Sequence, residues 1–195
     1  MSAEDLFLCR FYDIMMWVMN MDKEKELPKR KKNRLENYDY SSCGAYFITI
    51  CTKDRKNMFW EKQQFDFVGE DNILPSDRIN LSLYGKIADK AITAMPEHYP
   101  NIDVLQYVIM PNHIHLLLFI ADDGGRIISS PTNKGSIITA VGQMKRQISK
   151  KIGATIWQRS FHDHIIRDKS DYEKISKYMY ENPIKWQYDC FYVKE

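Results

Sequence analysis

The order of predicted elements indicates an α+β fold of the ferredoxin-like kind: an antiparallel sheet with helices packed on one face, plus a C-terminal helix. Three observations support this prediction. Four short stretches are rich in β-branched and aromatic residues, and three longer stretches place apolar residues at helical spacing. Together they follow the order β-α-β-β-α-β-α. A chain of 195 residues with 44% hydrophobic composition is long enough for one domain with a buried core.

The first half of the pattern is a strand, a helix and a hairpin. Residues 45–52 (AYFITICT) predict a strand, and residues 83–95 (LYGKIADKAITAM) predict a helix that Pro96 stops. Residues 102–110 and 113–120 predict two further strands. Pro111-Asn112 between them is a turn signal, so we expect an antiparallel hairpin. Residues 61–80 are expected to be irregular, with a short strand near residues 65–68.

The second half is a helix, a strand and a last helix. Residues 136–152 predict an amphipathic helix that ends at Gly153, after a surface loop at 122–134. The second half of residues 156–166 predicts a strand. Ser170-Asp171-Tyr172-Glu173 has the pattern of a capping box, so the last helix is expected to begin there. We expect it to run to about Asn182, because the residue before a proline disfavours the helical region.

The composition favours a cytoplasmic protein but excludes few classes of function. The net charge of +2 indicates no particular partner, and the four cysteines show no CxxC spacing, which fits reduced thiols. Residues 6–19 are apolar, but they fall short of the roughly 20 residues that cross a bilayer, so no membrane partner is expected. Residues 1–20 are either an upstream extension of the reading frame or a short helix on the domain.

Three segments are expected along the chain. Residues 1–33 are predicted to be an N-terminal extension and basic arm, residues 34–186 the functional domain, and residues 187–195 a C-terminal tail. The run from Lys29 to Arg34 is either a solvated arm or a contact for backbone phosphates. Candidate phosphate-binding residues across the chain are Lys29, Arg30, Lys31, Lys32, Arg34, Lys145, Arg146, Lys150, Lys151, Arg159 and Arg167.

A histidine pair opens the second strand of the predicted hairpin. Side chains alternate along a strand, so His113 and His115 share one face and Ile114 points to the other. Two imidazoles placed in this way can bind one divalent ion, although core packing explains many such pairs. The position beside a turn predicts that solvent and substrate reach them. Two protein ligands also leave open positions on the ion, as catalysis needs.

A second pair has the same spacing. His162-Asp163-His164 has a charged residue between its histidines, which is typical of an edge strand or a surface. It is the weaker candidate for the metal site. Its alternatives are a place beside the active site or a contact with DNA.

The last predicted helix contains a candidate nucleophile. Tyr178 and Asn182 are four residues apart and share a helix face, whereas Tyr180 lies about 200° around the axis from Tyr178. Only one of the two tyrosines can therefore face a given site. The alternative is that these tyrosines only pack against the sheet.

Several strings resemble a known family. They are YVIMPNHIHLLL, WQRSFHDHIIR and YMYENP in this order, preceded by YDYSSCGAYFITICTKDR. The chain resembles, over roughly residues 34–186, the REP-associated branch of the single-tyrosine HUH transposases.

The resemblance implies a mechanism and its residues. His113 and His115 would bind a divalent ion, Mg²⁺ or Mn²⁺, and Asn182 would complete the metal site where relatives have Gln or a carboxylate. Tyr178 would attack a phosphate of single-stranded DNA near a hairpin and form a 5′-phosphotyrosine link. No energy cofactor is implied. Relatives work as monomers or as homodimers that exchange the tyrosine helix, so a homodimer is one of two expected states.

Three rival interpretations stay open at this point. The first is a DNA-binding protein of the same fold that acts at repeat hairpins without strand transfer. The second is a metal-dependent hydrolase that uses His113 and His115 with a water nucleophile. The third is a structural α+β domain with no catalytic site.

Overall fold

The computed structural model describes residues 38–61, 79–121 and 136–193. The chain divides into two compact units, Met1–Lys32 and Asn33–Glu195, and every described residue belongs to the second. The expected strand near residues 65–68, the loop at 122–134 and the basic arm lie outside the described residues.

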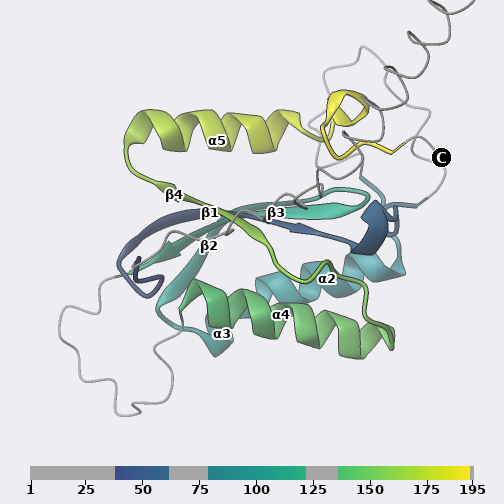
Figure 1. The fold of residues 1–195 in the computed structure, drawn as a ribbon, viewed down its shortest axis with the longest axis horizontal. Helices are drawn as coiled ribbons and strands as arrows, with labels where there is room; N and C mark the ends of the chain where they lie inside the picture. Colours follow the sequence, from purple (N-terminus) through teal and green to yellow (C-terminus); the bar gives the residue numbers. More distant parts are fainter. Residues whose placement is uncertain (1–37, 62–78, 122–135, 194–195) are drawn as a thin grey trace, which may run out of the picture. The chain divides into compact units, whose positions relative to one another are not determined.

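A four-stranded antiparallel sheet forms the centre of the structure (Figure 1). Its strands, in chain order, are β1 (Gly44–Cys51), β2 (Ile102–Ile109), β3 (His113–Ile120) and β4 (His162–Ile166). They are arranged in the order β2-β3-β1-β4, so β3 and β1 are central and β2 and β4 are edges. The predicted hairpin is confirmed, because β2 pairs with β3 in antiparallel register. The predicted ferredoxin-like α+β class is confirmed as well.

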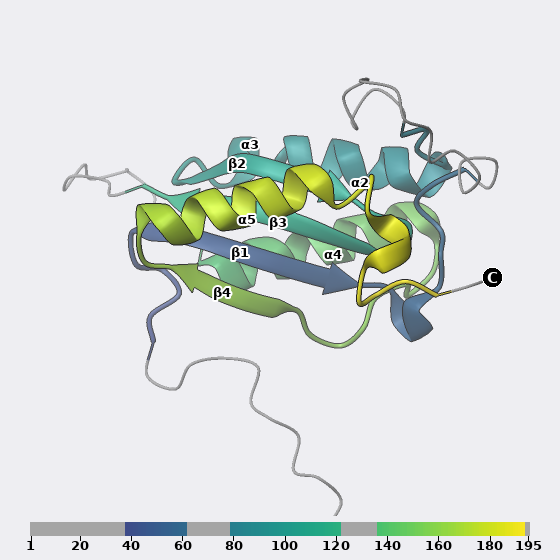
Figure 2. The ribbon, with the colours of Figure 1, turned by 90° about the horizontal axis from the view of Figure 1, so that it is seen from above.

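Helices cover both faces of the sheet. One face carries α2 (Leu83–Thr93), the short α3 (Met95–His98) and α4 (Ile137–Ile152), and the other carries α5 (Lys169–Glu181) (Figures 1 and 2). Two 3₁₀ turns complete the described elements, η1 (Lys53–Arg55) and η4 (Trp186–Tyr188). Within the described ranges, no helix is long and apolar enough to cross a membrane.

The alternation of side chains along β3 decides which residues face which helix layer. Ile114, Leu116 and Leu118 are fully buried in the core shared with α2 and α4. The intervening residues, His113 and His115 among them, therefore face the α5 side. β1 pairs with all of β3, and β2 pairs with it from Ile114 to Ile120 with one bulge, which fixes this register.

Helix ends agree with the predictions except at two places. Ser136 caps α4 by accepting from Thr139 N, and Gly153 ends it with φ 79°. The helix α2 ends at Thr93, two residues early, because Pro96 belongs to the first turn of α3.

The predicted capping box of the last helix is wrong. Asp168, not Ser170, is the N-cap of α5, and its carboxylate accepts from Asp171 N at 2.9 Å. Aspartate caps as well as serine does, and Asp168 comes first after β4. The predicted end holds, since Asn182 is the C-cap before Pro183.

Two glycines give a matched stability test. A Cβ on Gly85 in α2 would lie 2.2 Å from the carbonyl oxygen of Phe59, a backbone atom that cannot turn aside. A Cβ on Gly142 in α4 would meet nothing within 4 Å. We expect Gly85→Ala to lower the free energy of unfolding by ~1–3 kcal/mol, as overpacking does. Gly142→Ala should raise it by about 0.5–1 kcal/mol through helix propensity. Urea unfolding of the two variants checks both; equal effects would contradict the packing of α2 on Phe59.

Candidate metal and tyrosine site

The histidine pair of β3 is buried, not open to solvent. His113 and His115 have relative exposures of 0% and 1%. The rings of Trp186 and Phe191 lie 5.9 Å and 4.6 Å from the His113 ring and cover it. The prediction that a place beside the turn leaves the pair accessible is therefore wrong. The reason is that the segment after α5 folds back over this end of the sheet.

Hydrogen bonds fix the orientation of His113. Its Nδ1 lies 2.9 Å from Asn112 Oδ1. The amide nitrogen of Asn112 donates to the carbonyl oxygens of Arg55 and Phe191, at 3.1 Å and 2.8 Å, so its Oδ1 must be the atom that faces the ring. His113 therefore carries its proton on Nδ1, and its Nε2 has a free lone pair.

His115 is held in the same way by a hydroxyl group. Thr49 on β1 lies opposite His115, with its Oγ1 2.9 Å from His115 Nδ1. The Nε2 atoms of His113 and His115 face one another at 3.0 Å. When the Thr49 hydroxyl accepts a hydrogen bond from the Nδ1–H group of His115, both Nε2 lone pairs point into the same small space. Two nitrogens this close can both bond one ion at the usual ~2.1 Å.

Tyr178 of α5 reaches the same place from the other layer. Its phenol oxygen lies 3.3 Å from His115 Nε2, and its ring packs edge-on to His115 and Phe47, with centroids 5.3 Å and 6.3 Å away. The next residue, Met179, is buried, while Tyr180 lies on the opposite flank of the helix and is 49% exposed. The structure thus brings Tyr178, rather than Tyr180, to the histidines within one chain.

Sequence reasoning missed Asp189. The ligand atoms of Asp189, His113 and His115 all lie within 4.8 Å of one another, so the three residues could hold a metal ion. Tyr178 also donates to Asp189 Oδ2 at 3.3 Å. No sequence signal could have found this residue, because it is a single carboxylate in the C-terminal tail, outside any motif.

Asn182, the C-cap of α5, is a buried polar residue. It is 3% exposed, yet neither polar atom of its side-chain amide has a hydrogen-bond partner. Tyr178 and Trp186, one turn before and after it, contact His115 and His113 respectively. An unpaired buried amide costs about 1–3 kcal/mol and calls for a reason. The oxygen and nitrogen donors assembled here fit a divalent ion.

Burial sets the protonation states of the site. Desolvation, with a further effect of the nearby Arg55 charge, lowers the pKa of His113 to about 3. Burial and the proximity of His113 bring the pKa of His115 well below its usual 6.5. Both imidazoles are thus neutral at pH 7, as metal ligands must be. Burial, followed by the charge of Asp189, raises the pKa of the Tyr178 phenol above its ordinary 10.

The second histidine pair lies at the edge of the sheet, as its charged middle residue predicted. His162 and His164 are both exposed on β4. His164 Nε2 is 2.7 Å from Asp171 Oδ2 on α5, and Asp163 accepts from the Tyr40 hydroxyl at 2.6 Å. Thr49 lies between His115 and His162 in the sheet register, so this pair is beside the first one.

The predicted phosphate-binding residues fall into four groups. The first is Lys145 alone, whose Nζ donates to the carbonyl oxygens of Gln158 and Ser160, both at 2.8 Å, so it ties the chain after α4 to the helix. The other cations of α4 are exposed on the sheet face opposite the histidines; they are Arg146, Lys150 and Lys151. Two further arginines, Arg159 and Arg167, are exposed near β4. The arm lies outside the described residues; its cations are Lys29, Arg30, Lys31, Lys32 and Arg34.

Arg55 is a cation that the sequence did not single out. It is exposed beside the site, where its guanidinium lies 5.2 Å above the Phe191 ring and donates to Cys190 O at 3.1 Å. Its backbone and that of Asp54 have φ of 54° and 56°, a conformation that residues with side chains seldom adopt.

Comparison with known proteins identifies relatives. No family model matches the chain. A Haemophilus influenzae protein without a characterised function is 30% identical over 183 residues, which cover 84% of this chain and 93% of that protein. A second H. influenzae protein, named "Putative REP-associated tyrosine transposase", is 28% identical over 174 residues, covering 81% and 86%. The chain is thus similar over most of its length to a protein named as a REP-associated tyrosine transposase.

A solved structure of such a transposase shares the fold. The REP-associated tyrosine transposase bound to a REP hairpin superposes with a TM-score of 0.51 at 19% identity, over 80% of this chain and 76% of that one. The resemblance noted in the sequence is thereby confirmed at the level of family and fold. The similarity relates the chain to a named transposase, and the roles of its individual residues are a separate question.

The stability of the protein should fall at acid pH because His113 is buried in its neutral form. Below pH 6.5 the unfolded chain takes up a proton on this residue that the folded chain does not accept until about pH 3, so stability falls as the pH falls through this range. Urea unfolding between pH 7 and pH 4 should show a shallower fall for His113→Gln than for the wild type. The exposed His98, changed to Gln, is the control and should follow the wild type. Parallel curves for all three proteins would contradict the burial.

Thr49 should control metal affinity through His115. Thr49→Val keeps the shape of the side chain but removes the oxygen that holds His115 Nδ1. Loss of such a supporting partner typically weakens metal binding about 10–100-fold. Isothermal titration with Mn²⁺ measures this, with Thr93→Val as a control, since Thr93 is exposed and bonds only within its own helix. Unchanged Mn²⁺ affinity in Thr49→Val would mean that the ion binds elsewhere.

Proposed function

We propose that the protein nicks and rejoins single-stranded DNA by metal-assisted transesterification through a 5′-phosphotyrosine intermediate. One observation carries the proposal: the Tyr178 oxygen lies 3.3 Å from His115 Nε2, which is itself 3.0 Å from His113 Nε2. A nucleophile and a pair of metal ligands from segments about 65 residues apart thus meet at one point. Similarity to a named transposase supports this reading of the geometry.

Each residue has a defined part in the proposed reaction. His113 and His115 would hold the ion, with Asp189 or Asn182 as the oxygen ligand. The bound ion, Mg²⁺ or Mn²⁺, would stabilise negative charge on the phosphate and favour the phenolate form of Tyr178. Without such help the phenol is a poor nucleophile, because burial and Asp189 raise its pKa.

The step conserves the energy of the bond that it breaks. Tyr178 Oη attacks the phosphorus and loses its proton. His115 Nε2 and Asp189 Oδ2 both lie 3.3 Å away, and with His115 Nε2 taken up by the ion, Asp189 Oδ2 would accept the proton. The 3′-oxygen of the preceding nucleotide leaves and becomes a hydroxyl. Attack by a 3′-hydroxyl on the phosphotyrosine reverses the step and releases the phenol. No nucleotide cofactor is consumed, and one phosphodiester is exchanged for another.

The carboxylate of Asp189 marks a place that suits a phosphate oxygen. It is the one anionic group among the described residues within ligand distance of both histidines. A phosphate bound beside the histidines would displace the covering Phe191 ring. Arg55, Arg159 and Arg167 are the exposed cations that we propose for backbone phosphates, together with the basic arm. The relative whose structure holds a REP hairpin supports a hairpin flanked by single strands as the substrate.

One chain supplies every residue of the proposed site. Tyr178 contacts His115 of its own chain, so activity would not require exchange of α5 between two subunits. A homodimer is compatible with this arrangement, and a monomer is sufficient.

Tyr178→Phe should abolish covalent capture of DNA. The variant keeps the ring packing but lacks the attacking oxygen, so a labelled hairpin with single-stranded flanks and Mn²⁺ should give no protein–DNA adduct on a denaturing gel. Tyr180→Phe, on the opposite flank of α5, should form the adduct nearly as well as the wild type. Cleavage that survives in Tyr178→Phe would instead favour a hydrolase with a water nucleophile. Binding without an adduct in the wild type under any divalent metal would favour a non-catalytic DNA-binding protein.

A further inference from the structure

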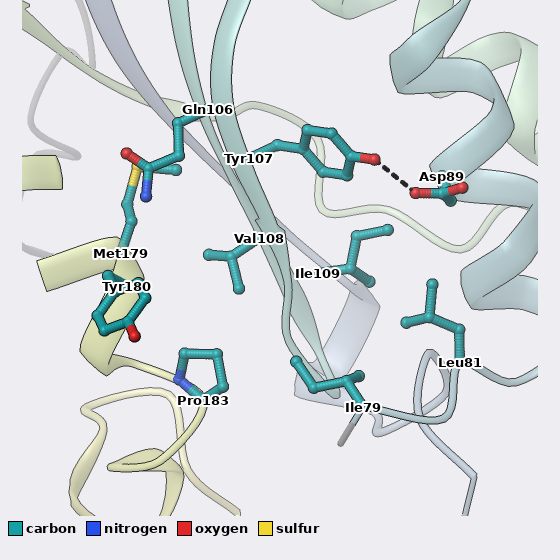
Figure 3. Close-up of a pocket in the computed structure, with 10 residues that line it drawn as sticks. All are labelled: Ile79, Leu81, Asp89, Gln106, Tyr107, Val108, Ile109, Met179, Tyr180 and Pro183. Atoms are coloured by element: carbon teal, nitrogen blue, oxygen red, sulfur yellow. Dashed lines mark hydrogen bonds between the residues drawn. The ribbon is translucent and has the colours of Figure 1, made fainter. Parts of the chain in front are cut away.

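A groove runs along the free edge of the sheet, on the other side of α5 from Tyr178. It has a volume of ≈ 380 Å³ and curves around the edge strand β2 (Figure 3). On one side its wall is the C-terminal end of α5, with Met179, Tyr180 and Pro183. On the other side Leu81 and Asp89 close it. This volume is at the small end of the roughly 300–1,000 Å³ of ligand pockets.

The groove is next to the proposed catalytic site without belonging to it. Val108 on its floor is the register partner of His115, so one strand spacing separates the groove from the metal ligands. Tyr180 is two residues from Tyr178, on the opposite flank of the same helix, and Met179 between them is buried against the sheet. A DNA strand with its phosphate at Tyr178 has only to cross the end of α5 to reach the groove.

The lining suits a flat, uncharged ring system rather than a phosphate. Among the described residues that line the groove there is no Lys or Arg, and Asp89 would repel an anion. Val108, Met179 and Pro183 give an apolar floor, and the half-exposed ring of Tyr180 stands at the mouth. Aromatic rings in such positions are the surfaces on which unpaired bases stack.

The polar groups of the groove are fixed before any ligand arrives. Gln106 accepts from Ser176 Oγ at 2.8 Å and donates to Ser176 O at 3.3 Å, which leaves one N–H and one oxygen lone pair for a ligand. Tyr107 donates to Asp89 Oδ1 at 2.7 Å on the α2 side of the strand. A side-chain amide held in this way can hydrogen-bond the edge of a base that is stacked on Tyr180.

We propose that this groove binds one unpaired nucleobase of the DNA substrate, stacked on Tyr180 with its edge toward Gln106. This inference rests on the proposed function, because it takes single-stranded DNA as the substrate. It assigns to Tyr180 a binding role distinct from the attacking role of Tyr178. The base would anchor the strand on one flank of α5 while the scissile phosphate lies on the other.

The test asks whether the loss of one particular base weakens binding only when the Tyr180 ring is present. In the Tyr178→Phe background, which prevents cleavage, each nucleotide of the single-stranded flanks of a REP hairpin is replaced in turn by an abasic residue, and Kd is measured. At one position the missing base should weaken binding about 5- to 100-fold, the range of base–aromatic stacking. With Tyr180→Ala added, the same replacement should cost nothing, whereas Tyr180→Phe should preserve the full penalty.

A second tyrosine of the same helix provides the control. Tyr172 is 36% exposed but does not line the groove, so Tyr172→Ala should leave the abasic profile unchanged. If each abasic replacement weakened binding by the same factor with and without Tyr180→Ala, the proposal would be overturned. A failure of the protein to bind the hairpin at all would also overturn it. Adduct formation by the protein with Tyr178 intact is measured in parallel. An adduct without coupling to Tyr180 rejects the groove and leaves the proposed function standing.

Discussion

The alternation of side chains on β3 is the constraint on which the site depends. Ile114 is locked into the core beneath α2 and α4, and this forces His113 and His115 onto the face below α5. Because β3 pairs with strands on both sides, its register cannot slip by one residue without moving the histidines into the apolar core. The helix that carries Tyr178 lies on this same face, so the fold brings the two halves of the site together.

Burial explains both the order of the site and its chemistry. Two imidazoles with exposures near zero must find partners for their nitrogens, and Asn112 and Thr49 provide them at 2.9 Å each. The partners leave the Nε2 atoms free to face one another, and desolvation keeps both rings neutral. The same burial raises the pKa of the Tyr178 phenol. The His-His-Asp group of the site could therefore hold a metal ion, and the proposed function gives that ion the task of activating the tyrosine.

Local patterns predicted most of the fold, and tertiary contacts account for what they missed. Period-two and helical spacing predicted the strands, the hairpin and the helix faces, and showed that only one of Tyr178 and Tyr180 can face the histidines. The family resemblance pointed to Tyr178. The local patterns could not show that the segment after α5 folds back, which buries the pair and adds Asp189. They also could not show that Lys145 donates to Gln158 O and Ser160 O, because these are backbone atoms of an irregular segment. The start of α5 was predicted at the wrong residue because Asp168 and Ser170 are both good N-cap residues, and the sequence does not show which of them caps the helix.

The proposed function requires one ion to bind between His113 and His115, beside Tyr178 of the same chain. Anomalous diffraction from crystals grown with Mn²⁺ would locate this ion. We expect a single peak bonded to both Nε2 atoms, with the Tyr178 oxygen of that chain next to it. A peak at His162 and His164 instead, or a site completed by α5 of a second subunit, would contradict it.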